Sequence, residues 1–148
     1  MITMQREAFA KWYADAQPLI MAHHQEVTWR TITPEMDLLR YYALEAAGQL
    51  LLVTARQGSE MLGYVIASVC RHPNYATKCA FEAAHYLCPS ARQGLRSPWF
   101  RMVRFTRAEA KKMGAGELVI QSNSGKPIGP LFKAMGFKKT AEIYTGVL

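Results

Sequence analysis

A group of polar residues that could bind an anion follows a short apolar run in the middle of the chain. The run ends at Leu87-Cys88-Pro89, and Arg92-Gln93-Gly94-Leu95-Arg96-Ser97 comes shortly after it. Ser97-Pro98 then matches a helix start, with serine as N-cap and proline at the first helical position. A strand that passes through a small polar loop into a helix N-terminus points backbone N–H groups and the helix dipole at a bound anion. The sequence therefore predicts a pyrophosphate site in this loop.

Two side chains in the apolar run over residues 79–87 could move a proton. Glu82 is a lone carboxylate among apolar residues and is the leading candidate for a general base, with a solvent-facing edge position as the alternative. Histidine is a ready base near neutral pH, so His85 is the second candidate, with a structural role as its alternative. Three residues apart on a regular strand, the two would face opposite sides unless a β-bulge intervenes.

The positive charge of the chain is concentrated in the half that contains this loop. The 148 residues carry a net charge of +7. Residues 1–90 hold seven basic and eight acidic residues, whereas residues 91–148 hold eleven and three. Such a field attracts a nucleotide, a nucleic acid or an acidic protein partner.

Other classes of protein fit the sequence less well. The three cysteines are odd in number and lie in strand-like runs, which predicts reduced thiols in place of disulfides or a zinc site. The adjacent His23 and His24 do not share a helix face, so they predict a solvent-facing helix end and no metal site. No apolar run reaches the ~18 residues of a membrane span, and no signal-peptide pattern is visible. These features indicate a cytoplasmic protein.

Apolar spacing and turn residues predict the elements that position these side chains. Helices are expected over residues 4–24 with a kink at Pro18, over 34–47 with Thr33 as N-cap, over 98–113, and over 127–135. Strands are expected over residues 50–55 and 61–69, paired as a hairpin, and over 79–87 and 117–121, with one or two more within 137–147. This order predicts one α/β domain over residues 1–148, with a mixed sheet covered by helices on both faces.

In this arrangement the chain resembles the GNAT superfamily of N-acetyltransferases, and within it the small acetyltransferases of tailed phages. The likeness runs from residue 23 to the C-terminus. Its landmarks are Leu62-Gly63-Tyr64, His72-Pro73-Asn74-Tyr75, Tyr86-Leu87-Cys88-Pro89, Arg92-Gln93-Gly94-Leu95, Ala134-Met135-Gly136-Phe137 and Glu142-Ile143-Tyr144. The family's loop is usually written Q/R-x-x-G-x-G/A. Here Arg92 fits the first position and Ser97 the last, while Gly94 comes one place early and Leu95 takes the usual glycine position.

The resemblance implies acetyl-CoA as cosubstrate, lying between the strand that ends at Leu87 and the strand that ends at Gln121. Main-chain groups of Tyr86 and Leu87 would bind the pantetheine and the acetyl carbonyl like an added strand. Backbone N–H groups across Arg92, Gln93, Gly94, Leu95, Arg96 and Ser97 would hold the pyrophosphate. Asn123 would reach the pantetheine arm from the other side.

The resemblance also implies direct acetyl transfer to a primary amine of a small molecule, a protein or an aminoacyl-tRNA, in a ternary complex. Glu82, His85 or a water would act as base, and a backbone N–H near Leu87 would stabilise the oxyanion. The family's proton-donating tyrosine corresponds to Phe132, which cannot donate a proton. Tyr144 is the substitute candidate.

A basic stripe on the third predicted helix carries an alternative function. Arg101, Arg104, Arg107 and Lys111 recur at helical spacing, and Lys138 and Lys139 would extend the patch. A solvated helix face explains the stripe most simply. The alternative is a catalytically weak GNAT-fold module that binds a host protein or a nucleic acid through its basic half, and a toxin that acetylates charged tRNA is a third interpretation. GNAT proteins often pair through their last strands, which allows a homodimer.

Overall fold

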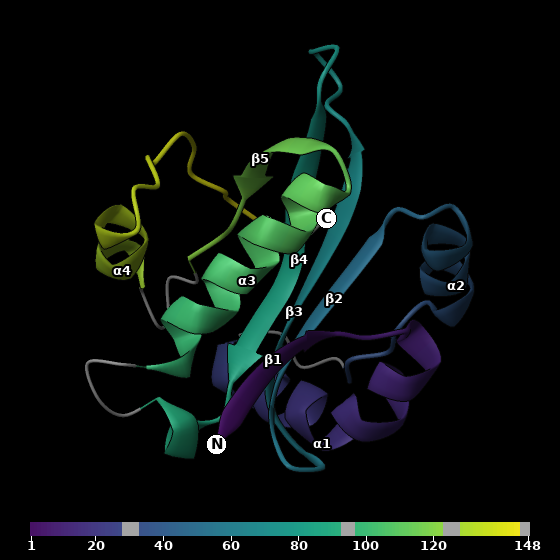
Figure 1. Cartoon of the computed structure of the whole chain (residues 1–148), viewed down its shortest axis with the longest axis vertical. Coiled ribbons are helices and arrows are strands. Elements are labelled where there is room, and N and C mark those ends of the chain that lie inside the picture. Colours follow the sequence, from purple (N-terminus) through teal and green to yellow (C-terminus); the bar gives the residue numbers. More distant parts are fainter. Residues whose placement is uncertain (28–32, 93–96, 123–127, 146–148) are drawn as a thin grey trace.

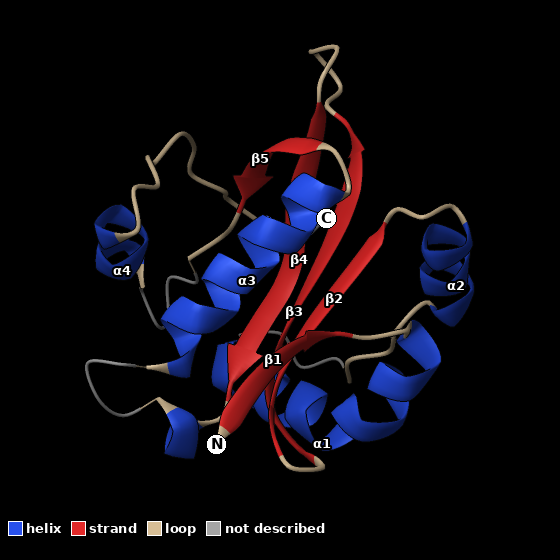
Figure 2. Ribbon diagram, viewed as in Figure 1, coloured by secondary structure: helices blue, strands red, loops and turns tan. Residues whose placement is uncertain are grey.

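The computed structural model describes residues 1–27, 33–92, 97–122 and 128–145. Within these residues five strands form one mixed sheet in the order β1-β2-β3-β4-β5, antiparallel except for the parallel pair β4–β5 (Figure 2). The strands are β1 (Ile2–Arg6), β2 (Leu50–Gln57), β3 (Glu60–Arg71), β4 (Lys78–Leu87) and β5 (Ala115–Val119). The expected hairpin is the pair β2–β3.

Helices cover both faces of the sheet, as predicted. One face packs against α1 (Phe9–Val27) and α2 (Leu38–Ala46), in a core centred on Trp12 and Tyr64. The other packs against α3 (Pro98–Lys112), with α4 (Gly129–Ala134) beyond β5 (Figure 1). A short 3₁₀ turn, Pro89–Ala91, joins β4 to the segment before α3. None of the helices in the described ranges is long and apolar enough to span a membrane.

The first predicted helix is wrong at its start, because residues 2–6 form a strand. Ile2 and Met4 pack against the core under α3, while Thr3 and Gln5 alternate with them. This period of two belongs to a strand, and pairing with β2 supplies the hydrogen bonds that a short isolated segment lacks. The helix itself begins at Phe9 and continues through Pro18 to Val27 as one element.

Three other boundaries differ from the prediction. α2 begins at Leu38, because Asp37 and not Thr33 caps it: the Asp37 carboxylate accepts from the N–H of Arg40 at 3.0 Å. β5 begins two residues earlier than expected, directly after Gly114 ends α3 with a φ of +88°. Residues 137–145 form no strand, so the predicted final strands are wrong for that described part. The N-cap of α3 is Ser97, as predicted, with Pro98 following it.

A β-bulge at Ala83 decides which face of the sheet the rest of β4 presents. Residues 82 and 84 pair with consecutive residues of β3, so Ala83 has no partner there. Cross-strand partners share a face, and Glu82 pairs with Ala67 while His85 pairs with Val65. Both partners belong to the core under α3, so Glu82 and His85 lie on the same face of the sheet.

Gly63 on β3 lies where β4 approaches most closely. A Cβ at this position would lie 2.5 Å from the carbonyl oxygen of Tyr86 and 2.8 Å from Cδ1 of Leu87. Because the carbonyl is part of the β3–β4 ladder, we expect Gly63→Ala to destabilise the fold by about 1–3 kcal/mol, measured by urea unfolding. Gly129→Ala is the control, since a Cβ there meets nothing within 4 Å. Equal stability of the two variants would contradict the argument.

Candidate active site

A cavity opens where β4 and β5 part. The two strands pair only as far as Phe81 and Val119. Beyond that point a cavity of about 520 Å³ lies between β4 and the segment that follows β5, lined by the C-terminal turn of α1, the end of β4, the start of α3, Gln121, Ser122, and residues before and within α4. Glu82 bridges the point of separation, because its Oε2 accepts a hydrogen bond from the N–H of Gln121 at 3.0 Å.

Glu82 and His85 meet on the cavity wall. Nδ1 of His85 lies 3.2 Å from Oε1 of Glu82, at ion-pair distance, although the two atoms are not aligned as a hydrogen bond. The Glu82 side chain is only 3% exposed, whereas the His85 side chain is 14% exposed. The His85 ring packs against Trp99 of α3, with ring centroids 4.6 Å apart. The imidazole is therefore the more accessible group of this pair.

The main chain of Leu87 faces the cavity. Cys88 donates its N–H to the carbonyl of Leu62 on β3 at 2.8 Å. Because main-chain groups alternate sides along a strand, the N–H and carbonyl of Leu87 point away from β3 and toward the space left by β5. Tyr86, one residue earlier, also lines the cavity, but its ring lies on the α1 face of the sheet.

The structure places two residues of the predicted pyrophosphate loop. Ser97 lines the cavity, and its hydroxyl accepts from the N–H of Trp99 at 3.3 Å, as an N-cap should. Arg92 also lines the cavity, but its side chain turns toward α1 and pairs with Glu26. Gln93, Gly94, Leu95, Arg96 and Asn123 lie outside the described residues.

Phe132 and Tyr144, the two positions considered for proton donation, lie in different environments. Phe132 is buried, and its ring meets the His85 ring edge-on at 6.2 Å. Tyr144 is 86% exposed, donates a hydrogen bond to Glu142 at 2.7 Å, and is not part of the cavity wall. The structure thus brings Phe132 to the Glu82–His85 pair and does not bring Tyr144 there.

His23 is a cavity residue that the sequence analysis assigned to solvent. It is half-buried, its ring stacks on Tyr86 at 5.2 Å, and its Nδ1 lies 2.9 Å from the hydroxyl of Tyr64. Burial, and then the charge of His85, lower the pKa of His23 to about 4, so the ring is neutral at physiological pH. The spacing of His23 from the buried Trp12 and Ala16 puts all three on one face of α1, and this signal could have located it.

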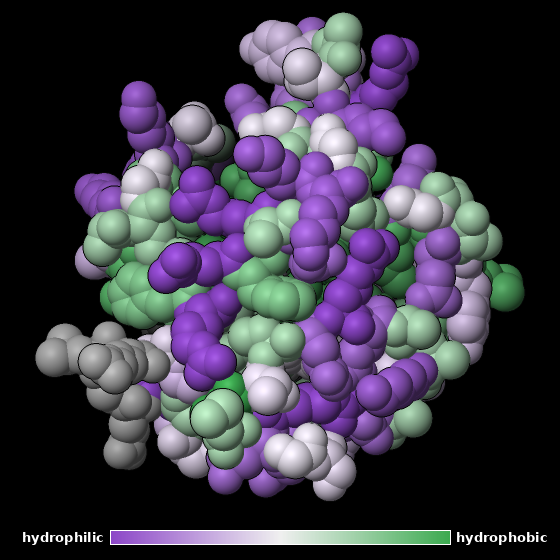
Figure 3. Space-filling model, in the orientation of Figure 1, coloured by the Kyte–Doolittle hydropathy of each residue, from purple (hydrophilic) through white to green (hydrophobic). Residues whose placement is uncertain are grey.

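The basic stripe lies on the outer surface of α3. Arg101, Arg104, Arg107 and Lys111 are exposed, and hydrophilic side chains gather over this helix in Figure 3. Arg107 also donates to the carbonyl of Met135 at 3.1 Å and covers the ring of Phe137. This arrangement agrees with a solvated helix face that helps to hold the segment after α4.

Solved structures match this chain along its whole length, although no family model and no curated protein sequence matches it. A Pyrococcus furiosus protein assigned as an acetyl transferase superposes with a TM-score of 0.75 at 19% identity, covering 100% of both chains. The ribosomal-protein-alanine N-acetyltransferase of Brucella melitensis biovar Abortus 2308 gives 0.69 at 12% identity, over 100% of this chain and 97% of that one. AAC(6')-Iy, solved with the bisubstrate analogue CoA-S-monomethyl-acetylneamine, gives 0.69 at 15% identity, over 100% and 98%.

These similarities agree with the mixed five-stranded sheet and the helices that flank it. The chain therefore has the fold of the GNAT N-acetyltransferases.

Proposed function

We propose that this protein transfers an acetyl group from acetyl-CoA to a primary amine of a small molecule, a protein or an aminoacyl-tRNA. The observation that carries the proposal is the cavity between β4 and the segment that follows β5, where the Glu82–His85 pair and Leu87 line the same wall. The same fold holds a CoA conjugate in the AAC(6')-Iy structure, which supports the choice of donor.

The donor would lie along the free edge of β4. The pantetheine arm would use outward main-chain groups of β4 other than those of Leu87, as an added strand does. The start of α3, where Ser97 lines the cavity, would face the pyrophosphate, since a helix N-terminus attracts negative charge. The excess of basic residues in the second half of the chain favours the same anionic ligand.

His85 would act as the general base, and Glu82 would position it. The Glu82 carboxylate is already engaged by the N–H of Gln121 and is almost fully buried, so it is poorly placed to reach an amine. Its second oxygen lies beside Nδ1 of His85, which leaves Nε2 of the ring to face the acceptor. The acceptor nitrogen would attack the thioester carbon and pass its proton to Nε2 as the C–N bond forms.

The remaining steps need an oxyanion donor and a proton for the leaving group. The N–H of Leu87 would stabilise the oxyanion of the tetrahedral intermediate. When the C–S bond breaks, His85 would return the proton to the CoA thiolate, while the amide product keeps the acetyl group. The edge of Phe132 packs against the His85 ring, so the imidazole lies next to the position where the resemblance places a tyrosine. A separate tyrosine acid is then unnecessary.

Thermal unfolding with acetyl-CoA tests the proposal. Ligand at about 100 times its Kd should stabilise the fold by ~2.7 kcal/mol, which shifts the midpoint of a domain of this size by several degrees. Ala83→Trp should remove the shift, because Ala83 is exposed and lines the cavity, so a bulky side chain would occlude it without entering the core.

Ala108→Trp is the matched control. Ala108 is equally exposed, but it lies on α3 outside the cavity wall. This variant should keep the shift of the natural sequence. If acetyl-CoA and CoA both leave the midpoint of the natural protein unchanged, the proposed activity is wrong.

A further inference from the structure

The last turn of α1 is attached to β4 at two points, three residues apart. His23 stacks on Tyr86 of β4 and contacts the hydroxyl of Tyr64, the cross-strand partner of Tyr86 on β3. Glu26, on the same face of the helix, pairs with Arg92 just beyond β4. The helix turn is far in sequence from Tyr64, Tyr86 and Arg92, and four of the five residues line the cavity: His23, Glu26, Tyr86 and Arg92.

Each of the three guanidinium nitrogens of Arg92 has a partner within the protein, although the side chain is 32% exposed. Its two terminal nitrogens lie 2.7 and 2.9 Å from the two carboxylate oxygens of Glu26, which is a bidentate pair. Its Nε donates to the carbonyl of Leu87 at 2.6 Å. The guanidinium carbon also lies over the ring of Tyr86, 5.4 Å from its centroid.

We propose that Arg92 and Glu26 form a clamp that holds the end of α1 against the end of β4, and that the Arg92 side chain positions the site without binding the phosphates of the cosubstrate. This inference rests on the proposed acetyl transfer for its catalytic consequence. The clamp itself consists of the bidentate pair and the hydrogen bond to Leu87.

Three features of the geometry favour a positioning role over phosphate binding. A phosphate that bound both terminal nitrogens in the same two-point way would have to displace Glu26, whose side chain is only 14% exposed. It would also turn Nε away from the carbonyl of Leu87. The backbone N–H of Arg92 is likewise occupied, since it donates to the carbonyl of Pro89 at 3.2 Å.

The clamp contacts two parts of the proposed active site. Through Leu87 it fixes the residue whose N–H would bind the oxyanion. Through Glu26 it fixes the helix turn that carries His23 into the cavity. Loss of the clamp should therefore lower kcat much more than it weakens CoA binding.

The test compares Arg92→Ala, Glu26→Ala and the double variant Arg92→Glu/Glu26→Arg. Binding of CoA is measured by calorimetry, and acetyl transfer is measured with hydroxylamine as the amine probe. We expect the two single variants to bind CoA within about threefold of the natural protein and to lose tenfold or more in kcat. The charge-reversed pair should recover part of that loss. Arg101→Ala, an exposed arginine outside the cavity, is the control and should behave as the natural protein does.

Two other results would contradict the positioning role of Arg92. If Arg92→Ala weakens CoA binding tenfold or more while Glu26→Ala keeps or strengthens it, Arg92 is a phosphate ligand. Unchanged kcat in both single variants would also refute the positioning role.

Failure of the proposed function would give a different pattern, in which the natural protein binds no CoA. The thermal unfolding midpoints of the variants then test whether the Arg92–Glu26 pair holds the fold together, independently of catalysis. For this comparison Arg92→Ala and Glu26→Ala are also combined in one variant: equal losses in the two single variants and this double variant support the clamp, and additive losses refute it.

Discussion

Replacement of His85 by glutamine is expected to lower the kcat of acetyl transfer by about 10²–10⁴-fold, the usual contribution of a positioned general base. Glutamine is similar in size and polar, so the packing against Trp99 should survive, but an amide cannot accept a proton at neutral pH. The measurement is the initial rate of CoA release at saturating acetyl-CoA, with hydroxylamine as the amine. CoA binding by the variant shows that the cavity is intact.

Two further variants separate the roles of the pair. His24→Gln is the matched control, because His24 is on α1 and outside the cavity wall, and its kcat should be unchanged. Glu82→Gln should cost less than His85→Gln, since it removes the carboxylate that orients the ring and leaves the base itself. If Glu82→Gln abolishes turnover while His85→Gln retains it, Glu82 is the base and the proposed roles of Glu82 and His85 are exchanged.

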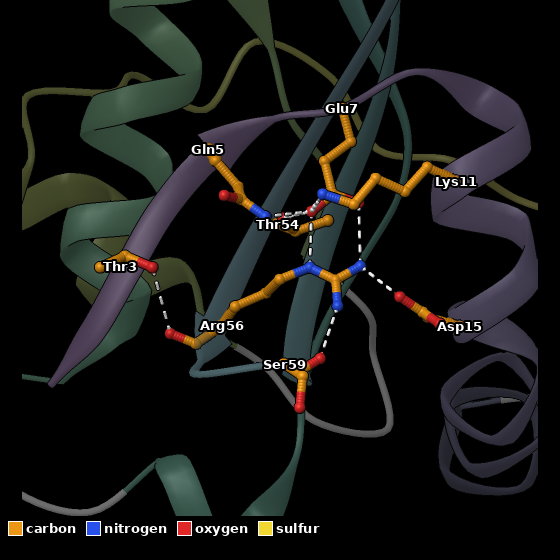
Figure 4. Close-up of polar contacts among 8 residues, drawn as sticks. All are labelled: Thr3, Gln5, Glu7, Lys11, Asp15, Thr54, Arg56 and Ser59. Atoms are coloured by element: carbon orange, nitrogen blue, oxygen red, sulfur yellow. Dashed lines mark hydrogen bonds and ion pairs between the residues drawn. The ribbon is translucent and has the colours of Figure 1, made fainter.

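The second large effect concerns a buried ion pair on the opposite edge of the sheet. Arg56 of β2 is 4% exposed, and its Nε and one terminal nitrogen bind the two carboxylate oxygens of Glu7 at 2.5 and 2.9 Å (Figure 4). It also binds Asp15 of α1 at 2.7 Å and the carbonyl of Ser59 at 2.8 Å. Thr54 donates to Glu7 at 2.9 Å. The network joins the end of β1, α1 and the β2–β3 turn.

Arg56→Met is expected to destabilise the fold by about 3–5 kcal/mol, because it removes the two-point partner of the buried Glu7 carboxylate and leaves only the exposed Lys11, at 3.9 Å. Urea unfolding measures the loss. Arg56→Met combined with Glu7→Leu should cost less than Arg56→Met alone, since no buried charge then remains unpaired. Arg71→Met, at an exposed strand end, is the control and should change stability little. Comparable losses for Arg56→Met and Arg71→Met would contradict the assigned role.

The same pair makes stability depend on pH. Burial alone would raise the pKa of Glu7, but hydrogen bonds from Arg56, Gln5 and Thr54 outweigh it and lower that pKa below its usual value. Because the pKa of Glu7 is lower in the folded than in the unfolded state, its ionised carboxylate stabilises the fold at every pH above the unfolded pKa of about 4.3. This contribution is lost as the pH falls through the folded pKa. The stability gap between the natural protein and Glu7→Gln should therefore narrow as the pH is lowered below about 4. A gap that stays constant would contradict this account.

Local signals in the sequence were sufficient for much of the fold. Ser97-Pro98 marks the start of α3 and Gly114 marks its end. Both signals are local, because capping and a positive φ depend on the residue itself and its immediate neighbours. The β2–β3 hairpin followed from two apolar runs separated by a short turn. The start of the chain was mispredicted, because residues 2–6 become a strand only through pairing with β2, some fifty residues away.

The sequence by itself determined which chemistry is present: a carboxylate and an imidazole in one strand, followed by a loop and a capped helix. Tertiary structure decided how these groups are arranged. The bulge at Ala83 places Glu82 and His85 on one face, and β5 ends at Val119, beyond which the cavity lies beside them. Arg92 meets Glu26 across 66 positions of sequence, a contact that no local spacing encodes. Residues far apart in the chain meet only when the sheet and its helices pack, so their partners could be found only in the folded molecule.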